Sequence, residues 1–141
     1  MSAYQLLHVE DDAATSYLLE NALQDAHVDA SMYCVPDGLE ALDFLSLSGR
    51  YQAAPVPNLV ILDLNLPRLG GMDMLRRLRQ RPGKFKVPVI ILSTSQSEKE
   101  RGEALDLGVE AFFSKPPSYE GLVKFAAEID LKFLRGRTPS A

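Results

Sequence analysis

Short apolar runs rich in Val, Ile, Leu and Phe alternate with segments whose apolar residues recur at helical spacing. The apolar runs that predict buried strands cover residues 5–9, 29–35, 59–63, 87–92 and 110–114. Helical periodicity covers residues 13–26, 39–47, 72–80, 98–107 and 118–134. Regular alternation of strand and helix is typical of parallel βαβ units with right-handed crossovers. The pattern therefore predicts an α/β fold in which helices cover both faces of a five-stranded parallel sheet.

Composition and charge narrow the class of protein. The chain has 141 residues, of which 46% are hydrophobic and 24% charged, as in one ordinary globular domain. We expect a domain over residues 1–134 and a polar C-terminal tail over residues 135–141. The net charge is −4 and the pattern contains no long basic run, membrane span or signal peptide, so we expect a cytoplasmic protein that binds neither nucleic acid nor membrane. Cys34 is the single cysteine, and His8 inside the first strand is expected to be a hydrogen-bonded core histidine.

Functional side chains follow four of the five predicted strands. Glu10 and Asp11 follow the first strand, Asp63 the third, Ser93 the fourth and Lys115 the fifth. Because the carboxyl ends of parallel strands meet at one edge of a sheet, these groups are expected to lie together. Crowded carboxylates raise one another's pKa, and a hard divalent cation such as Mg²⁺ relieves this repulsion. Asp63 is then a candidate nucleophile toward phosphorus, although taken alone it is equally well explained as a cap or turn residue.

Four segments of the chain carry a specific set of motifs. They are Val9-Glu10-Asp11, Leu62-Asp63-Leu64-Asn65-Leu66-Pro67, Val87-Pro88-Val89-Ile90-Ile91-Leu92-Ser93 and Phe113-Ser114-Lys115-Pro116. With these motifs the chain resembles the receiver domain of two-component response regulators, of the chemotaxis-receiver type, across nearly its whole length. The resemblance implies a flavodoxin-like (βα)5 three-layer sandwich with strand order 2-1-3-4-5.

The resemblance assigns roles to the acidic residues. Asp63 matches the phosphoacceptor, and Asp11 and Asp63 are expected to bind Mg²⁺ directly. Glu10 is expected to act through a water molecule, and Asn65 to supply its backbone carbonyl as a further ligand. The acidic pair could also be read one residue later, but Glu10 and Asp11 directly follow the apolar strand, which leaves Asp12 as a helix cap.

The resemblance also assigns the residues that respond to phosphorylation. Lys115 matches the lysine that contacts the phosphoryl group, and the Lys115–Pro116 peptide bond is expected to be cis. Ser93 matches the switch hydroxyl because it directly follows the apolar run, with Thr94 as the alternative. Phe112 stands at the position of the switch aromatic, and without a hydroxyl it cannot make a tyrosine-type hydrogen bond.

The last predicted helix has more apolar surface than one sheet face requires. The residues that face one way and cover the sheet are Tyr119, Leu122, Phe125, Ala126, Ile129 and Phe133. The residues that extend the apolar arc past half of the helix are Val123, Ala127, Leu131 and Leu134. Scattered apolar residues on a surface are normal, but we interpret this second set as part of a homodimer interface formed by the helix and its neighbouring strand.

These features predict a single-domain response regulator. A sensor histidine kinase donates a phosphoryl group to Asp63 in the presence of Mg²⁺, and the contacts of Ser93 and Lys115 shift a partner-binding surface. The chain then binds a downstream protein or passes the phosphoryl group on, as a signalling switch and not as an enzyme. The long loop over residues 48–58, the Leu-Ser-Thr-Ser segment and the apolar last helix look like the subgroup paired with bacterial and cyanobacterial phytochromes.

Three other classes of protein fit the motifs less well. Phosphatases and mutases with an aspartate nucleophile usually carry a second acid two residues later, where this chain has Asn65. A receiver-like binding module that is never phosphorylated does not need the complete set of Asp11, Asp63, Ser93 and Lys115. A flavodoxin offers hydroxyls and backbone amides to phosphate in its first loop, whereas this loop offers three acids.

Overall fold

The computed structural model describes residues 2–81 and 87–135. Its strands are β1 (Tyr4–Val9), β2 (Ala30–Val35), β3 (Leu59–Leu62), β4 (Val89–Ser93) and β5 (Ala111–Ser114). Its helices are α1 (Ala13–Asp25), α2 (Gly38–Leu45), α3 (Gly71–Gln80), α4 (Glu98–Asp106) and α5 (Tyr119–Ile129), with the 3-10 turn η1 (Gly49–Tyr51) and the π-helix η2 (Asp130–Leu134). Residues 136–141 of the expected tail lie outside the described residues.

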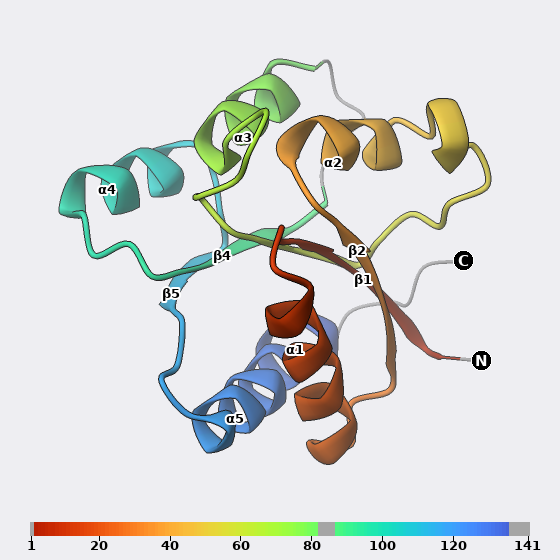
Figure 1. The fold of residues 1–141 in the computed structure, drawn as a ribbon, viewed down its shortest axis with the longest axis vertical. Helices are drawn as coiled ribbons and strands as arrows, with labels where there is room; N and C mark the ends of the chain where they lie inside the picture. The colour runs from red at the N-terminus through yellow and green to blue at the C-terminus, as the bar shows by residue number, and fades with distance from the viewer. Residues whose placement is uncertain (1, 82–86, 136–141) are drawn as a thin grey trace.

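The strands form one parallel sheet in the order β2-β1-β3-β4-β5. Helices α1 and α5 cover one face and helices α2, α3 and α4 cover the other, so the domain has three layers (Figure 1). Successive strand residues point to opposite faces: Leu6 lies in the core beneath α1 and α5, and Leu7 in the core on the opposite face. The predicted α/β fold and strand order are therefore confirmed.

Polar caps fix where four helices begin after the strand-end loops. The side chains of Asp12, Asp37, Ser97 and Ser118 each accept a hydrogen bond from a backbone N–H in the first turn of their helix. The prediction that Asp12 caps the first helix is thus confirmed. In the part of the chain that the structure describes, no helix has both the length and the apolar character that crossing a membrane requires.

The long connection between α2 and β3 folds back onto α2. Its turn η1 places the Tyr51 ring 5.3 Å from the Phe44 ring, measured between centroids. The Tyr51 hydroxyl donates a hydrogen bond to Glu40 Oε1 at 2.5 Å. This connection is consequently anchored beside the first turn of α2 and is part of the packed domain.

The end of the last helix differs from the prediction. After α5 the chain continues as η2 (Asp130–Leu134), and the Arg135 N–H donates to the Asp130 carbonyl at 2.8 Å, five residues back. A π-turn holds more residues than an α-turn, so the side chains of this segment are rotated relative to a continuous α-helix. Leu134 is fully buried as a result, whereas Leu131 is 63% exposed. Placing Leu134 in a dimer surface is therefore wrong.

Candidate functional site

Three carboxylates meet at the carboxyl edge of the sheet. Strands β1 and β3 are neighbours, so the loops that follow them bring Glu10 and Asp63 side by side. One oxygen atom from each of Glu10, Asp11 and Asp63 lies within 4.8 Å of the other two. Glu10 and Asp63 are each 5% exposed, whereas Asp11 is open to solvent. The acidic residues that the sequence analysis selected therefore lie together, while Asp12 turns its carboxylate toward α1, where it accepts hydrogen bonds from Ala14 N and Thr15 Oγ1.

Lys115 links two of these carboxylates. Its Nζ atom lies 2.7 Å from Glu10 Oε1 and 3.1 Å from Asp63 Oδ2. Its backbone N–H donates to the Ser93 carbonyl at 2.9 Å, which ties the loop after β5 to the end of β4. The lysine thus lies across the two carboxylates, with its side chain only 21% exposed.

Burial and charge act in opposite directions on this pair. Burial raises the pKa of the Glu10 carboxyl, and the hydrogen bond from Lys115 offsets only part of that effect. Burial lowers the pKa of the Lys115 ammonium, but its hydrogen bonds to Glu10 and Asp63, together with the negative charges of these two carboxylates, outweigh burial and raise that pKa above its ordinary value. Lys115 is therefore charged at neutral pH and can donate hydrogen bonds to an anion.

The donor set fits a hard divalent cation. Its three side chains offer only carboxylate oxygens, and three acids face one ammonium group, which leaves an excess of negative charge. Oxygen donors of this kind suit Mg²⁺ and Mn²⁺ better than softer metals. The Asn65 N–H donates to Asp63 Oδ1 at 3.2 Å, so the Asn65 backbone lies beside the cluster.

The candidate switch residues lie at the ends of β4 and β5. Ser93 is fully buried at the last position of β4, where its hydroxyl oxygen accepts a hydrogen bond from Ser95 N at 3.2 Å, and Thr94 is exposed. Phe112 on β5 is half-buried against the core under α2, α3 and α4. The Arg101 guanidinium on α4 lies 5.7 Å from the centre of the Phe112 ring. A change in the position of Phe112 would therefore alter a contact that α4 makes through Arg101.

The Lys115–Pro116 peptide bond is trans, so the expectation of a cis bond is wrong for this structure. The tertiary amide before proline brings the two isomers within about 1 kcal/mol of each other. A Lys-Pro sequence therefore does not determine the isomer, and the surrounding loop does. In the trans form the Lys115 side chain still reaches both carboxylates.

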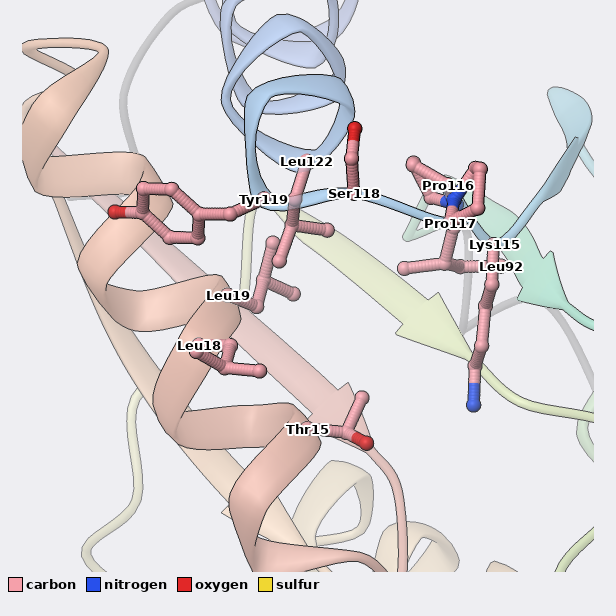
Figure 2. A pocket seen from close by; sticks show the side chains of 10 residues that line it. All are labelled: Thr15, Leu18, Leu19, Leu92, Lys115, Pro116, Pro117, Ser118, Tyr119 and Leu122. Carbon is pink, nitrogen blue, oxygen red and sulfur yellow. The ribbon is translucent and has the colours of Figure 1, made fainter.

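An apolar pocket of about 220 Å³ adjoins Lys115 (Figure 2). Leu18 on α1 and Leu122 on α5 form opposite walls, Pro116 lies at the β5–α5 end, and the Tyr119 side chain points toward α1. Leu18 is 47% exposed at the rim. No local motif in the sequence predicts this pocket, because its lining comes from segments that are distant along the chain.

His8 lies on β1, two residues before Glu10, and is only 1% exposed. Its Nδ1 atom is 3.0 Å from the Ser16 hydroxyl on α1, which confirms the expectation of a hydrogen-bonded core histidine. Burial, together with the positive charge of Lys115, lowers the pKa of His8 to about 4. The imidazole is therefore neutral at pH 7 and stays neutral well below it.

Replacing His8 by Gln is expected to make folding less sensitive to acid. The unfolded chain binds the imidazole proton near pH 6.5 and the folded chain only near pH 4, so the unfolded state binds more protons and stability falls as pH drops through this window. Between about pH 7 and pH 5, the free energy of unfolding of the wild type should fall by about 2 kcal/mol more than that of His8→Gln. Urea unfolding followed by circular dichroism measures this difference, with the exposed His27→Gln as control. Equal losses in wild type and His8→Gln would contradict it.

Comparison with known proteins agrees with this geometry. The family model for the response regulator receiver domain matches residues 6–127. The response regulator Rcp1 of Synechocystis sp. is 34% identical over 125 residues, which cover 89% of this chain and 85% of Rcp1.

Solved structures match over almost the whole chain. The Mn²⁺-bound form of Rcp1 is 33% identical with a TM-score of 0.86, and the match covers 98% of this chain and 99% of Rcp1. The phosphorylated cyanobacterial phytochrome response regulator RcpA is 31% identical with a TM-score of 0.88, again covering 98% of this chain and 99% of the other. The chain therefore belongs to the response regulator receiver domain family, and it is similar to the response regulator Rcp1 and to the cyanobacterial phytochrome response regulator RcpA.

Proposed function

We propose that this chain is a phosphorylation-dependent switch that accepts a phosphoryl group on Asp63 from a sensor histidine kinase. The observation that carries the proposal is the contact of one ammonium group, Lys115 Nζ, with both Asp63 and Glu10 at the edge of the sheet. The carboxylates of Asp11 and Asp63, with the Asn65 carbonyl, are the groups we assign to Mg²⁺, and Glu10 is assigned to a water ligand. When bound, Mg²⁺ neutralises negative charge on the phosphoryl oxygens.

The residues of the chain suit an in-line phosphoryl transfer. A carboxylate oxygen of Asp63 forms the new P–O bond while the P–N bond of a phosphohistidine breaks, and the leaving imidazole takes up a proton. Asp63 is held for this step, because Asn65 N–H donates to Oδ1 and Lys115 donates to Oδ2. After transfer, we propose that the Lys115 ammonium moves its hydrogen bonds to the phosphoryl oxygens, where it balances their charge.

The new phosphoryl group is proposed to change the partner-binding surface through Ser93. A phosphoryl oxygen accepts a hydrogen bond from the Ser93 hydroxyl, which draws the loop after β4 toward Asp63. Phe112 and α4 follow this loop, since Arg101 on α4 contacts the Phe112 ring. Such a change is a population shift that is driven by contacts made only in the phosphorylated state.

Incubation with acetyl phosphate tests the proposal without a kinase. The chain should gain the mass of one phosphoryl group in the presence of Mg²⁺ and none when EDTA removes the metal. Intact-protein mass spectrometry measures the gain, and peptide mapping after borohydride reduction of the acyl phosphate locates it. A chain that stays unmodified with Mg²⁺ would contradict the proposal.

The apolar pocket beside Lys115 is the surface that we propose contacts the kinase. Its lining includes Lys115, which contacts Asp63, and the α1 residue Leu18, which is 47% exposed. A kinase that delivers a phosphohistidine to Asp63 must cover this edge of the domain. Because RcpA is a cyanobacterial phytochrome response regulator, we propose a phytochrome as the kinase.

A charge placed in this pocket is expected to slow phosphoryl transfer from a histidine kinase and to leave phosphorylation by acetyl phosphate unchanged. Leu18→Glu should slow transfer from a phosphorylated histidine kinase by at least about tenfold, which corresponds to about 1.4 kcal/mol of lost binding. Phosphorylation by acetyl phosphate should be unchanged, because a small donor does not need the pocket. Quench-flow with radiolabelled kinase measures the first rate, and Val56→Glu, at a residue 62% exposed on a distant loop, is the control. Equal slowing with both donors would contradict the docking role.

We further propose that the chain forms a homodimer through α5 and β5. Ala127 on α5 and Leu131 on η2 are exposed apolar residues, and Val123 on α5 is half-buried. The proposed dimer surface therefore consists of Val123, Ala127 and Leu131, and it no longer includes the buried Leu134. Dimerisation there would cover Leu131, the most exposed leucine among the described residues.

A further inference from the structure

The loop between β3 and α3 is joined directly to the phosphoacceptor. The Asn65 N–H donates to Asp63 Oδ1 at 3.2 Å, and the Gly71 N–H donates to the Leu64 carbonyl at 3.1 Å. A Cβ atom on Gly71 would lie 2.3 Å from the Asp63 carbonyl oxygen, so the first residue of α3 is packed against the backbone of Asp63. Any change in the shape of this loop must therefore move the Asp63 carboxylate or the Asn65 carbonyl.

The middle of this loop contains an unfavourable backbone conformation. Arg68 has a φ angle of +61°, and the Leu69 N–H donates to the Pro67 carbonyl at 2.7 Å, which closes a three-residue turn around Arg68. Residues with long side chains seldom adopt positive φ, and a γ-turn with positive φ at its centre is the rarer, strained form. The loop is consequently held in this shape by contacts that it makes elsewhere.

Those contacts come from the start of α2. Arg68 Nη1 lies 3.2 Å from Asp37 Oδ2, and the Asp37 side chain is only 3% exposed. The other oxygen of Asp37 caps α2 by accepting a hydrogen bond from Glu40 N at 2.9 Å. The Gly38 N–H donates to the Leu69 carbonyl at 3.0 Å, and a Cβ atom on Gly38 would lie 2.6 Å from that oxygen. The loop and α2 are thus joined by an ion pair and by a close backbone contact.

We propose that Arg68 is a positioning residue: its ion pair with Asp37 holds the β3–α3 loop in the shape that presents Asp63 and the Asn65 carbonyl to a divalent cation. The inference rests on the proposed function. An exposed ion pair contributes little to an equilibrium, but Asp37 is buried, and loss of its partner leaves a buried carboxylate without that cation. Release of Arg68 also lets the turn at positive φ relax.

The sign of the change in metal affinity tests this role. Removing one positive charge near an acidic site should tighten Mg²⁺ binding by electrostatics alone. If Arg68 positions the loop, Arg68→Ala should instead weaken Mg²⁺ binding, with a dissociation constant about tenfold higher, as for other residues that orient metal ligands. Titration with Mg²⁺ at constant ionic strength, followed by NMR at the backbone amide of Asn65, measures the dissociation constant. Arg68→Lys should recover part of the affinity.

Arg76→Ala is the matched control, because it removes the same charge from an exposed arginine on α3 that is paired with Asp73 and Glu103. Its affinity for Mg²⁺ should equal or exceed that of the wild type. An unchanged or higher affinity in Arg68→Ala would overturn the positioning role alone, and a wild type that binds no Mg²⁺ would overturn the proposed function with it. If Arg68→Ala does not fold, Arg68→Gly, which removes the guanidinium and accepts positive φ, decides by the same criterion.

Discussion

Asp63→Asn is expected to abolish phosphorylation. The amide oxygen of Asn carries no full negative charge, so it does not form an acyl phosphate at a useful rate, and one acid of the carboxylate cluster is lost as well. The rate of phosphoryl incorporation from acetyl phosphate should fall by at least about a thousandfold, the scale on which loss of a covalent nucleophile is measured. Intact-protein mass spectrometry over a time course, with Mg²⁺ present, gives both rates.

Asp12→Asn is the matched control for this experiment. It makes the same chemical change directly after the acidic pair of Glu10 and Asp11, at a side chain that caps α1, and Asn caps helices as well as Asp does. It should be phosphorylated at the wild-type rate. Equal incorporation in Asp63→Asn and wild type would place the phosphoryl group elsewhere, and loss of phosphorylation in Asp12→Asn would favour the acidic register that the sequence analysis set aside.

Most of the fold could be predicted, because its determinants are local. The apolar run at residues 59–63 is buried from Leu59 to Leu62 with no exposed position, as expected for a central parallel strand. Strands β1, β3 and β4 all end in buried residues directly before polar ones, so the parallel alternation was enough to place the acids at one edge of the sheet. The order of the strands needed the family resemblance, since periodicity does not say which strands are neighbours.

The features that could not be predicted depend on contacts between distant segments. The contact of Lys115 Nζ with Glu10 joins residues 105 positions apart, and the ion pair between Arg68 and Asp37 depends on how one loop packs against α2. Leu134 is buried because the chain forms a π-helix at this point. The spacing of apolar residues, when it is counted at 100° per residue, does not reveal a π-helix. A single change of helical pitch was enough to move an apolar residue from the surface to the core.

Leu134→Asp is therefore expected to destabilise the domain strongly and not merely to separate a dimer. Leu134 is fully buried in the core beneath α1 and α5. Truncating a buried leucine costs about 2 to 5 kcal/mol, and a carboxylate in its place adds the cost of burying a charge. The free energy of unfolding should fall by at least about 4 kcal/mol, out of a total of about 5 to 15 kcal/mol for an ordinary domain. Urea unfolding followed by far-UV circular dichroism measures it, and wild-type stability would contradict the burial of Leu134.

Leu131→Asp isolates the proposed interface, because it makes the same chemical change at a neighbouring position of η2 whose side chain is 63% exposed. A surface substitution of this kind should change the free energy of unfolding of the monomer by less than about 0.5 kcal/mol. The dimer should weaken by at least about tenfold in dissociation constant, because a carboxylate would have to be desolvated in each subunit. Sedimentation velocity over a range of concentrations separates the two effects. A Leu131→Asp dimer as tight as the wild type would place the interface elsewhere, since the most exposed leucine of α5 and η2 would then have no part in it.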